Sequence, residues 1–148
     1  MKLTDLFIIL HTTIRILTCR IFRPKISGKL FSMWHPKSHI SIRKNGKIMI
    51  GKRVTIELGT KLRSTGGKIQ IGNNTYINSY CMIVSHDQIV IGNNVSIGPM
   101  VCIYDHDHNF KNKEKGSSFI SKNIQIGDNV WIGAGVIILK GVQIGNNS

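Results

Sequence analysis

The chain has 148 residues, enough for one domain with a real core, and its hydrophobic content of 41% argues against wholesale disorder. Its formal net charge of +13 is concentrated in residues 1–53, where twelve Lys and Arg residues stand against the single acid Asp5. Residues 54–148 carry eight basic and six acidic side chains, so the larger part of the chain is nearly neutral. The basic first third predicts an anionic partner, but no zinc-finger, RNP or KH pattern accompanies it, which argues against nucleic acid.

Three cysteines, Cys19, Cys81 and Cys102, are an odd number, and no two are close in sequence. This usage is typical of buried thiols in a reducing compartment rather than of a disulfide framework or a metal site. We therefore expect a cytoplasmic protein that holds no metal.

Residues 1–23 predict a basic amphipathic helix that ends before Pro24. Arg15 interrupts the stretch, and it lacks the roughly 20 apolar residues that a membrane span requires. Two interpretations remain open: the helix lies on an anionic membrane surface at the inner membrane face, or it packs against the body or a neighbouring subunit. The apolar residues recur at steps of three and four and form one stripe: Leu3, Leu6, Phe7, Leu10, Ile14, Leu17 and Ile21.

Residues 24–49 read as a basic connector with a first irregular coil, and a six-residue repeat runs through residues 50–148. Most blocks open with Ile, often followed by Gly. Six residues make one short strand and one tight turn, and three such units close a coil that stacks about 4.8 Å from the next. Gly and Asn-Asn suit corners that need positive φ. The pattern predicts an all-β parallel β-helix with inward-pointing Ile.

The repeat is still running at Ser148, which predicts a β-helix domain that is incomplete at its C-terminal end. An inactive or truncated structural subunit is therefore an alternative to an enzyme.

Tyr104 to Phe110 interrupt the repeat with an Asp-His-Asp-His cluster. In an extended segment His106 and His108 would point the same way, and a neutral imidazole is suited to act as a general base. Asp105 could orient an imidazole or cap backbone N–H groups. If His86 joined the cluster, three His side chains could hold zinc, so a carbonic-anhydrase-like metalloenzyme is a second alternative.

Three runs of the repeat resemble the hexapeptide-repeat acyltransferases: Ile71–Asn78, Ile91–Val101 and Ile126–Gly135. They look most like the maltose and galactoside O-acetyltransferases and the acetyltransferases that modify capsule, O-antigen and exopolysaccharide sugars. The resemblance implies a left-handed coil and a homotrimer with active sites between subunits. It also implies direct transfer of an acetyl group from acetyl-CoA to a sugar hydroxyl.

On the acceptor side, the resemblance assigns the catalytic base to His108, with His106 as its neighbour or as an acceptor-binding residue. Which of the two imidazoles is the base stays open. Asn78 matches an acceptor-binding Asn of the family, and Ser85 stands where relatives carry an Asp. With Asp105, these residues are the candidate substrate-binding set.

On the donor side, the resemblance places the pantetheine arm of acetyl-CoA against Trp131 and the backbone of Gly133 and Ala134. Lys140 is the candidate contact for the CoA phosphates. A Trp is too large for an inner corner, so we expect Trp131 on an outer face. The Lys-rich segment 109–122 is predicted to leave the β-helix and to help form the neighbouring subunit's site.

Overall fold

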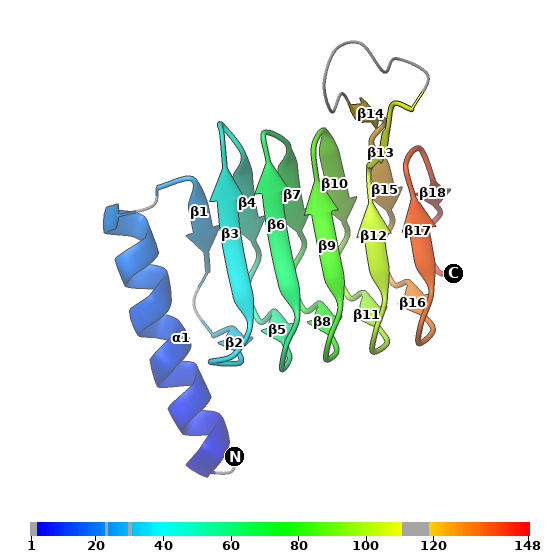
Figure 1. Ribbon diagram of the computed structural model, residues 1–148. Coiled ribbons are helices and arrows are strands. Elements are labelled where there is room, and N and C mark those ends of the chain that lie inside the picture. Colours follow the sequence, from blue (N-terminus) through cyan, green and yellow to red (C-terminus); the bar gives the residue numbers. More distant parts are fainter. Residues whose placement is uncertain (1–2, 23, 30, 111–118) are drawn as a thin grey trace.

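The computed structural model describes residues 3–22, 24–29, 31–110 and 119–148, which form one helix followed by a stack of short parallel strands (Figure 1). The predicted all-β parallel β-helix with an N-terminal helix is confirmed. The helix, α1, spans Leu3–Phe22. Sheet A contains β1 (Ile26–Gly28), β4 (Lys47–Ile50), β7 (Lys68–Ile71), β10 (Gln88–Ile91), β15 (Ile124–Ile126) and β18 (Gln143–Ile144). Sheet B contains β2 (Met33–Trp34), β5 (Thr55–Ile56), β8 (Tyr76–Ile77), β11 (Ser96–Ile97) and β16 (Trp131–Ile132). Sheet C contains β3 (His39–Arg43), β6 (Lys61–Thr65), β9 (Met82–Ser85), β12 (Cys102–Tyr104) and β17 (Ile137–Leu139).

The core is a set of aliphatic columns, because each sheet repeats the same register from coil to coil. In sheet B, Ile56, Ile77, Ile97 and Ile132 are direct partners, and each is at most 4% exposed. Sheets A and C contain equivalent columns. Stacked β-branched side chains pack well on a pleated surface, so the predicted inward position of the first residue in each block is confirmed.

The Gly-Asn-Asn sequences form the corner between sheets A and B. Asn74 and Asn94 adopt positive φ, and the side chain of Asn74 donates to that of Asn94 at 3.0 Å. A Cβ added to Gly72 would lie 2.3 Å from the carbonyl oxygen of Gly92 in the next coil. The corner therefore requires Gly for close coil-to-coil approach and Asn for a left-handed turn.

The first coil is regular and begins earlier than residue 50. β1 pairs with β4 and β3 pairs with β6, so residues 26–43 already occupy one strand position in each of the three sheets. Trp34 is fully buried in this coil, and a Cβ on Gly28 would meet its ring at 2.6 Å. A Trp fits inside here because the coil is terminal and α1, rather than another coil, covers it.

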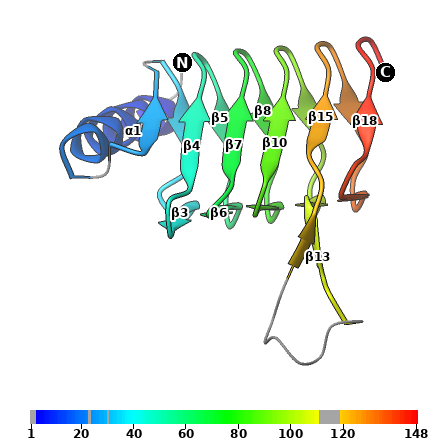
Figure 2. The same cartoon turned by 90° about the horizontal axis from the view of Figure 1, so that it is seen from above.

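Helix α1 lies across the N-terminal end of the stack (Figures 1 and 2). It packs through Thr12 and Ile16, which are buried, and the Thr12 hydroxyl accepts the Trp34 backbone N–H at 2.8 Å. Arg15 donates to the hydroxyl and carbonyl of Ser38. The predicted apolar stripe faces away from the body. Within the described residues, no helix is both long and apolar enough to cross a membrane.

Candidate active site

A hairpin leaves the β-helix at the corner between sheets C and A, where the repeat was predicted to be interrupted. Strand β13 (His106–His108) follows β12 after one residue and pairs antiparallel with β14 (Phe119–Ser121). Figures 1 and 2 show the hairpin projecting from the side of the stack. Residues 111–118, part of the segment predicted to help a neighbouring site, lie outside the described residues.

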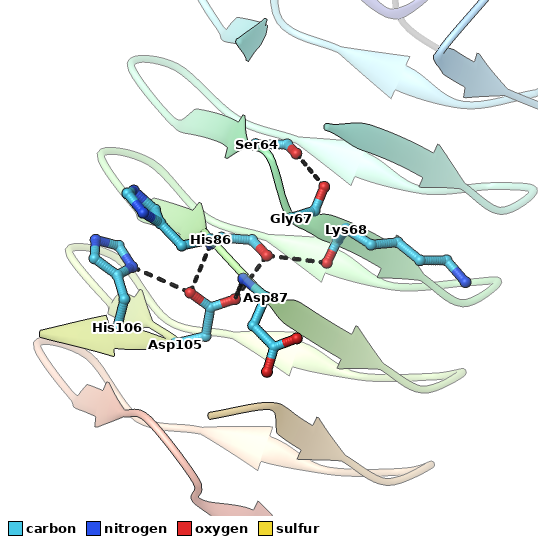
Figure 3. Close-up of polar contacts among 8 residues, drawn as sticks. Ser64, Gly67, Lys68, His86, Asp87, Asp105 and His106 are labelled. Atoms are coloured by element: carbon cyan, nitrogen blue, oxygen red, sulfur yellow. Dashed lines mark hydrogen bonds and ion pairs between the residues drawn. The ribbon is translucent and has the colours of Figure 1, made fainter. Parts of the chain in front are cut away.

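Asp105 fixes the point where the hairpin departs. Its side chain is fully buried, and Oδ1 accepts the backbone N–H of His86 at 2.7 Å. Oδ2 accepts the backbone N–H of Asp87 at 2.9 Å and lies 2.7 Å from the hydroxyl oxygen of Ser85 (Figure 3). One carboxylate therefore ties the turn after β12 to the turn after β9. Hydrogen bonds to a charged group are worth about 1.5–3 kcal/mol each, so this is a strong local clamp.

The sequence places an acid at a corner position that the two preceding coils fill with serine. Ser64 and Ser85 are register partners, and Asp105 follows Tyr104, whose partner is Val84, so it takes the equivalent place one coil on. The Ser64 hydroxyl bonds to a backbone carbonyl of its own corner. The two oxygens of the Asp105 carboxylate each accept one backbone N–H, and the corner stays closed although the chain leaves it.

Two neighbours orient the His106 ring: the carboxylate of Asp105 and the imidazole of His86. Nδ1 of His106 lies 3.1 Å from Oδ1 of Asp105, so a protonated Nδ1 donates to the carboxylate and Nε2 takes no part in this contact. Its ring stacks on that of His86 with the centroids 3.7 Å apart. Burial lowers the pKa of His86, and the neighbouring His106 lowers that pKa further, whereas the carboxylate of Asp105 opposes the shift.

His108 lies at the exposed end of β13 and is more exposed than His86 and His106. The ring of Phe119, its register partner in β14, is 4.7 Å from the His108 ring, centroid to centroid. Phe119 also contacts His106 at 5.2 Å and His86 at 4.2 Å. His106 and His108 therefore lie on the same side of the strand, and one aromatic ring touches all three imidazoles.

Lys140 reaches the hairpin from the coil below. It follows β17, and its Nζ forms an ion pair with Oδ2 of Asp107, which lies between the two histidines of β13. Lys140, the residue predicted to contact the CoA phosphates, therefore binds the carboxylate of Asp107 in this structure. The pair is partly exposed, with 31% of Lys140 and 46% of Asp107 accessible, so it contributes little to stability but steadies the outer edge of β13.

The remaining candidates lie at the opposite end of sheet C, at its corner with sheet B. Asn78 precedes β9, and its Oδ1 accepts the Ser79 backbone N–H at 2.7 Å. Trp131 is 74% exposed on the outer face of sheet B, as expected, and Gly133 and Ala134 follow it at the corner. The strands of sheet C run from these residues at one end to the hairpin at the other, so the two groups are a strand length apart (Figure 1). A single chain therefore does not bring the two groups together.

Two members of the cluster were not predicted as site residues. The sequence suggested His86 only as a third zinc ligand of the alternative metalloenzyme. Within the described residues, no group of three His, Cys, Asp or Glu side chains is arranged to hold a metal. Phe119 carries no sequence signal, because its place depends on how the chain returns to the stack. The run Ser85-His86-Asp87 was a usable signal, since it sits one coil before Asp105.

Comparison with known proteins places this geometry in a family. Over 119 residues, the chain is 32% identical to galactoside O-acetyltransferase of Lactococcus lactis subsp. lactis (strain IL1403); the match covers 79% of this chain and 57% of that protein. A family model described as bacterial transferase hexapeptide (six repeats) matches residues 123–148. The chain belongs to the hexapeptide-repeat transferase family. The predicted resemblance is therefore confirmed.

Other members of the hexapeptide-repeat family agree. An Escherichia coli (strain K12) protein, described provisionally as the lipopolysaccharide biosynthesis O-acetyl transferase WbbJ, is 34% identical over 116 residues, covering 71% of this chain and 59% of that one. The crystal structure of a hexapeptide-repeat-containing acetyltransferase from Vibrio cholerae O1 biovar eltor, complexed with acetyl coenzyme A, shares the fold. Its TM-score is 0.57 at 24% identity, over 93% of this chain and 61% of that chain. The chain spans between 41% and 59% of the length of the curated relatives it matches.

Proposed function

We propose that the protein is an acetyl-CoA-dependent O-acetyltransferase that acetylates a sugar hydroxyl of a surface polysaccharide. The relatives named as galactoside and lipopolysaccharide O-acetyltransferases support the reaction class, and the V. cholerae protein was crystallised with acetyl coenzyme A. The observation that carries the proposal is an exposed imidazole, His108, on a hairpin that a buried carboxylate anchors.

His108 is the general base of the proposed reaction. Its neutral imidazole takes the proton from the acceptor hydroxyl as that oxygen attacks the thioester carbonyl carbon. A new C–O bond forms, the C–S bond breaks, and the proton passes from His108 to the departing sulfur. No covalent intermediate on the protein is needed, since base and attacking oxygen can lie within one hydrogen bond of each other.

His106 is a poorer candidate for the base because its environment is closed. Its side chain is only 12% exposed, Asp105 holds Nδ1, and His86 covers one ring face. Its Nε2 is left to contact the acceptor. Ser85 and Asp105 are fully buried, so in this proposal they act through His106 rather than by touching the sugar. Asn78 remains the proposed direct contact on the acceptor.

Trp131, Gly133 and Ala134 are the proposed contacts for the pantetheine arm, and Lys140 for the CoA phosphates. Trp131 offers a large exposed apolar surface. Lys140 can serve a phosphate only by leaving or sharing Asp107, so donor binding is coupled to the hairpin through this ion pair.

The proposed assembly is a cytoplasmic homotrimer with each active site between two subunits. The separation of Trp131, Gly133 and Ala134 from the hairpin within one chain supports it. A triangular β-helix offers flat faces that can pack about a threefold axis and bring the Trp131 edge of one copy to the His108 hairpin of the next.

The test is acetyl-CoA turnover by the full chain with a panel of soluble sugars, with the acetyl ester identified by mass spectrometry. His108→Ala should lower kcat by about a hundredfold or more, the usual contribution of a general base. His39→Ala removes another exposed His, far from the hairpin, and should keep full activity. If His108→Ala is fully active and His106→Ala is not, the two roles must be exchanged. No transfer to any sugar would remove the proposed function.

A further inference from the structure

Helix α1 presents a continuous apolar face to solvent. We call it the outer face of α1; each member is at least 48% exposed: Leu3, Leu6, Phe7, Leu10, Ile14, Leu17 and Ile21. These positions recur at steps of three and four and therefore share one side of the helix. The opposite side, with Thr12 and Ile16, is the one that packs on the first coil. Large contiguous apolar surfaces on a folded protein mark interaction sites.

The outer face is placed so that a flat partner can reach it. α1 lies across the N-terminal end of the β-helix, whereas the hairpin with His108 projects from the side of the stack further along (Figures 1 and 2). A surface that contacts the outer face therefore leaves the proposed active site open.

Cations lie beside the C-terminal end of α1. A hollow beside the C-terminal end of α1 has apolar walls from Phe22 and Ile26, and its lining also includes Lys25, His39 and Arg43, all exposed. Residues 1–53 carry a net charge of +11, with Asp5 as their single acid. An apolar helix face with cations near one end of the helix complements an anionic lipid surface.

The same charge argues against a second copy of this chain as the occupant. Two copies that met through their outer faces would bring two basic first thirds together, and like charges oppose association. An anionic bilayer instead satisfies both features, because acyl chains take the apolar side chains and phosphate groups take the Lys and Arg side chains.

We propose that α1 lies in the plane of an anionic bilayer, with its outer face among the acyl chains and Lys25 and Arg43 at lipid phosphates. The helix is an interfacial anchor and not a span. The anchor holds the β-helix end-on to the membrane and leaves the His108 hairpin open at the side of the stack.

The test measures co-sedimentation of the full chain with phosphatidylcholine vesicles that contain or lack phosphatidylglycerol. The wild-type chain should bind the anionic vesicles, and binding should weaken as salt is raised. The pair Leu6→Glu/Leu10→Glu should lose at least about tenfold in affinity. The matched control, Gln70→Glu/Gln125→Glu, adds the same two charges at exposed positions of sheet A and should bind within about twofold of the wild type.

A second pair keeps the apolar face and removes the cations. Lys25→Gln/Arg43→Gln should abolish most of the preference for anionic over neutral vesicles. The proposal is overturned if the Leu6/Leu10 pair binds like the wild type, or if the wild type ignores phosphatidylglycerol. It is also overturned if the chain self-associates through the outer face without vesicles, which sedimentation velocity of the Leu6/Leu10 pair would reveal.

Discussion

Replacing Asp105 with Asn tests the buried clamp at the base of the hairpin, because the change keeps size and shape but removes the charge and one acceptor oxygen. An Asn oxygen directed at the His86 N–H turns its NH₂ group toward the Asp87 N–H. The reverse orientation turns NH₂ toward the N–H of His86 and toward Nδ1 of His106. Either way, a part-buried backbone donor loses its acceptor.

The magnitude follows from these contacts. An unsatisfied buried N–H costs about 1–3 kcal/mol, and the hydrogen bonds that remain fall from charged to neutral strength. Removal of a buried charge offsets part of this, since the carboxylate no longer has to be desolvated. We therefore expect Asp105→Asn to lower the free energy of unfolding by about 2–4 kcal/mol.

Urea unfolding at fixed protein concentration measures the loss, with Asp87→Asn as the control because that side chain is exposed and should cost under about 0.5 kcal/mol. Acetyl transfer by folded Asp105→Asn should also fall by about tenfold or more, since His106 is released from its tautomer and orientation. An Asn variant as stable and as active as the wild type would refute the clamp.

Three further changes address His86, Lys140 and the glycine corner. The pKa of His86 is lowered in the folded protein, so the unfolded chain binds its proton more tightly; stability is present above the ordinary pKa of 6.5 and falls as pH drops below it. His86→Phe should flatten that acid-side loss in urea midpoints measured from neutral to mildly acidic pH, and an unchanged slope would contradict the reasoning. Lys140→Met should change stability by less than about 1 kcal/mol but raise KM for acetyl-CoA, and an unchanged KM would remove Lys140 from the donor site. Gly72→Ala should cost about 1–3 kcal/mol of unfolding free energy from its clash with the next coil, whereas Gly145→Ala, with nothing near its added Cβ, should cost less than about 0.5 kcal/mol.

The β-helix was predictable because the same six-residue pattern recurs in successive blocks of the sequence. Ile at each inward position and Gly-Asn-Asn at one corner repeat the same physical requirement in successive coils. The regular first coil was harder to see, because Trp34 stands where later coils carry Ile and Gly28 makes room for it. The side on which α1 packs was not predictable from the apolar periodicity. The contact includes a hydrogen bond between Thr12 and the Trp34 backbone N–H, which a pattern of apolar residues does not show.

The candidate site was only partly predictable for a related reason. The Asp-His-Asp-His run is local in sequence, so the clustering of His106 and His108 followed from strand alternation. The contacts that sort their roles join distant segments: Ser85 through Asp87 to Asp105, Phe119 to three imidazoles, and Lys140 to the hairpin. Such contacts depend on which coils are adjacent after the chain leaves the stack and returns.

A subunit-mixing experiment tests most directly whether His108 transfers acetyl groups in a site that a neighbouring subunit completes. His108→Ala and Trp131→Ala chains, each nearly inactive alone, are co-expressed and purified together. Random trimers should regain about one quarter of the wild-type sites, because a site becomes intact where a Trp131→Ala subunit offers its hairpin to a His108→Ala subunit. Activity no greater than the sum of the two single variants would contradict a site built between subunits around His108.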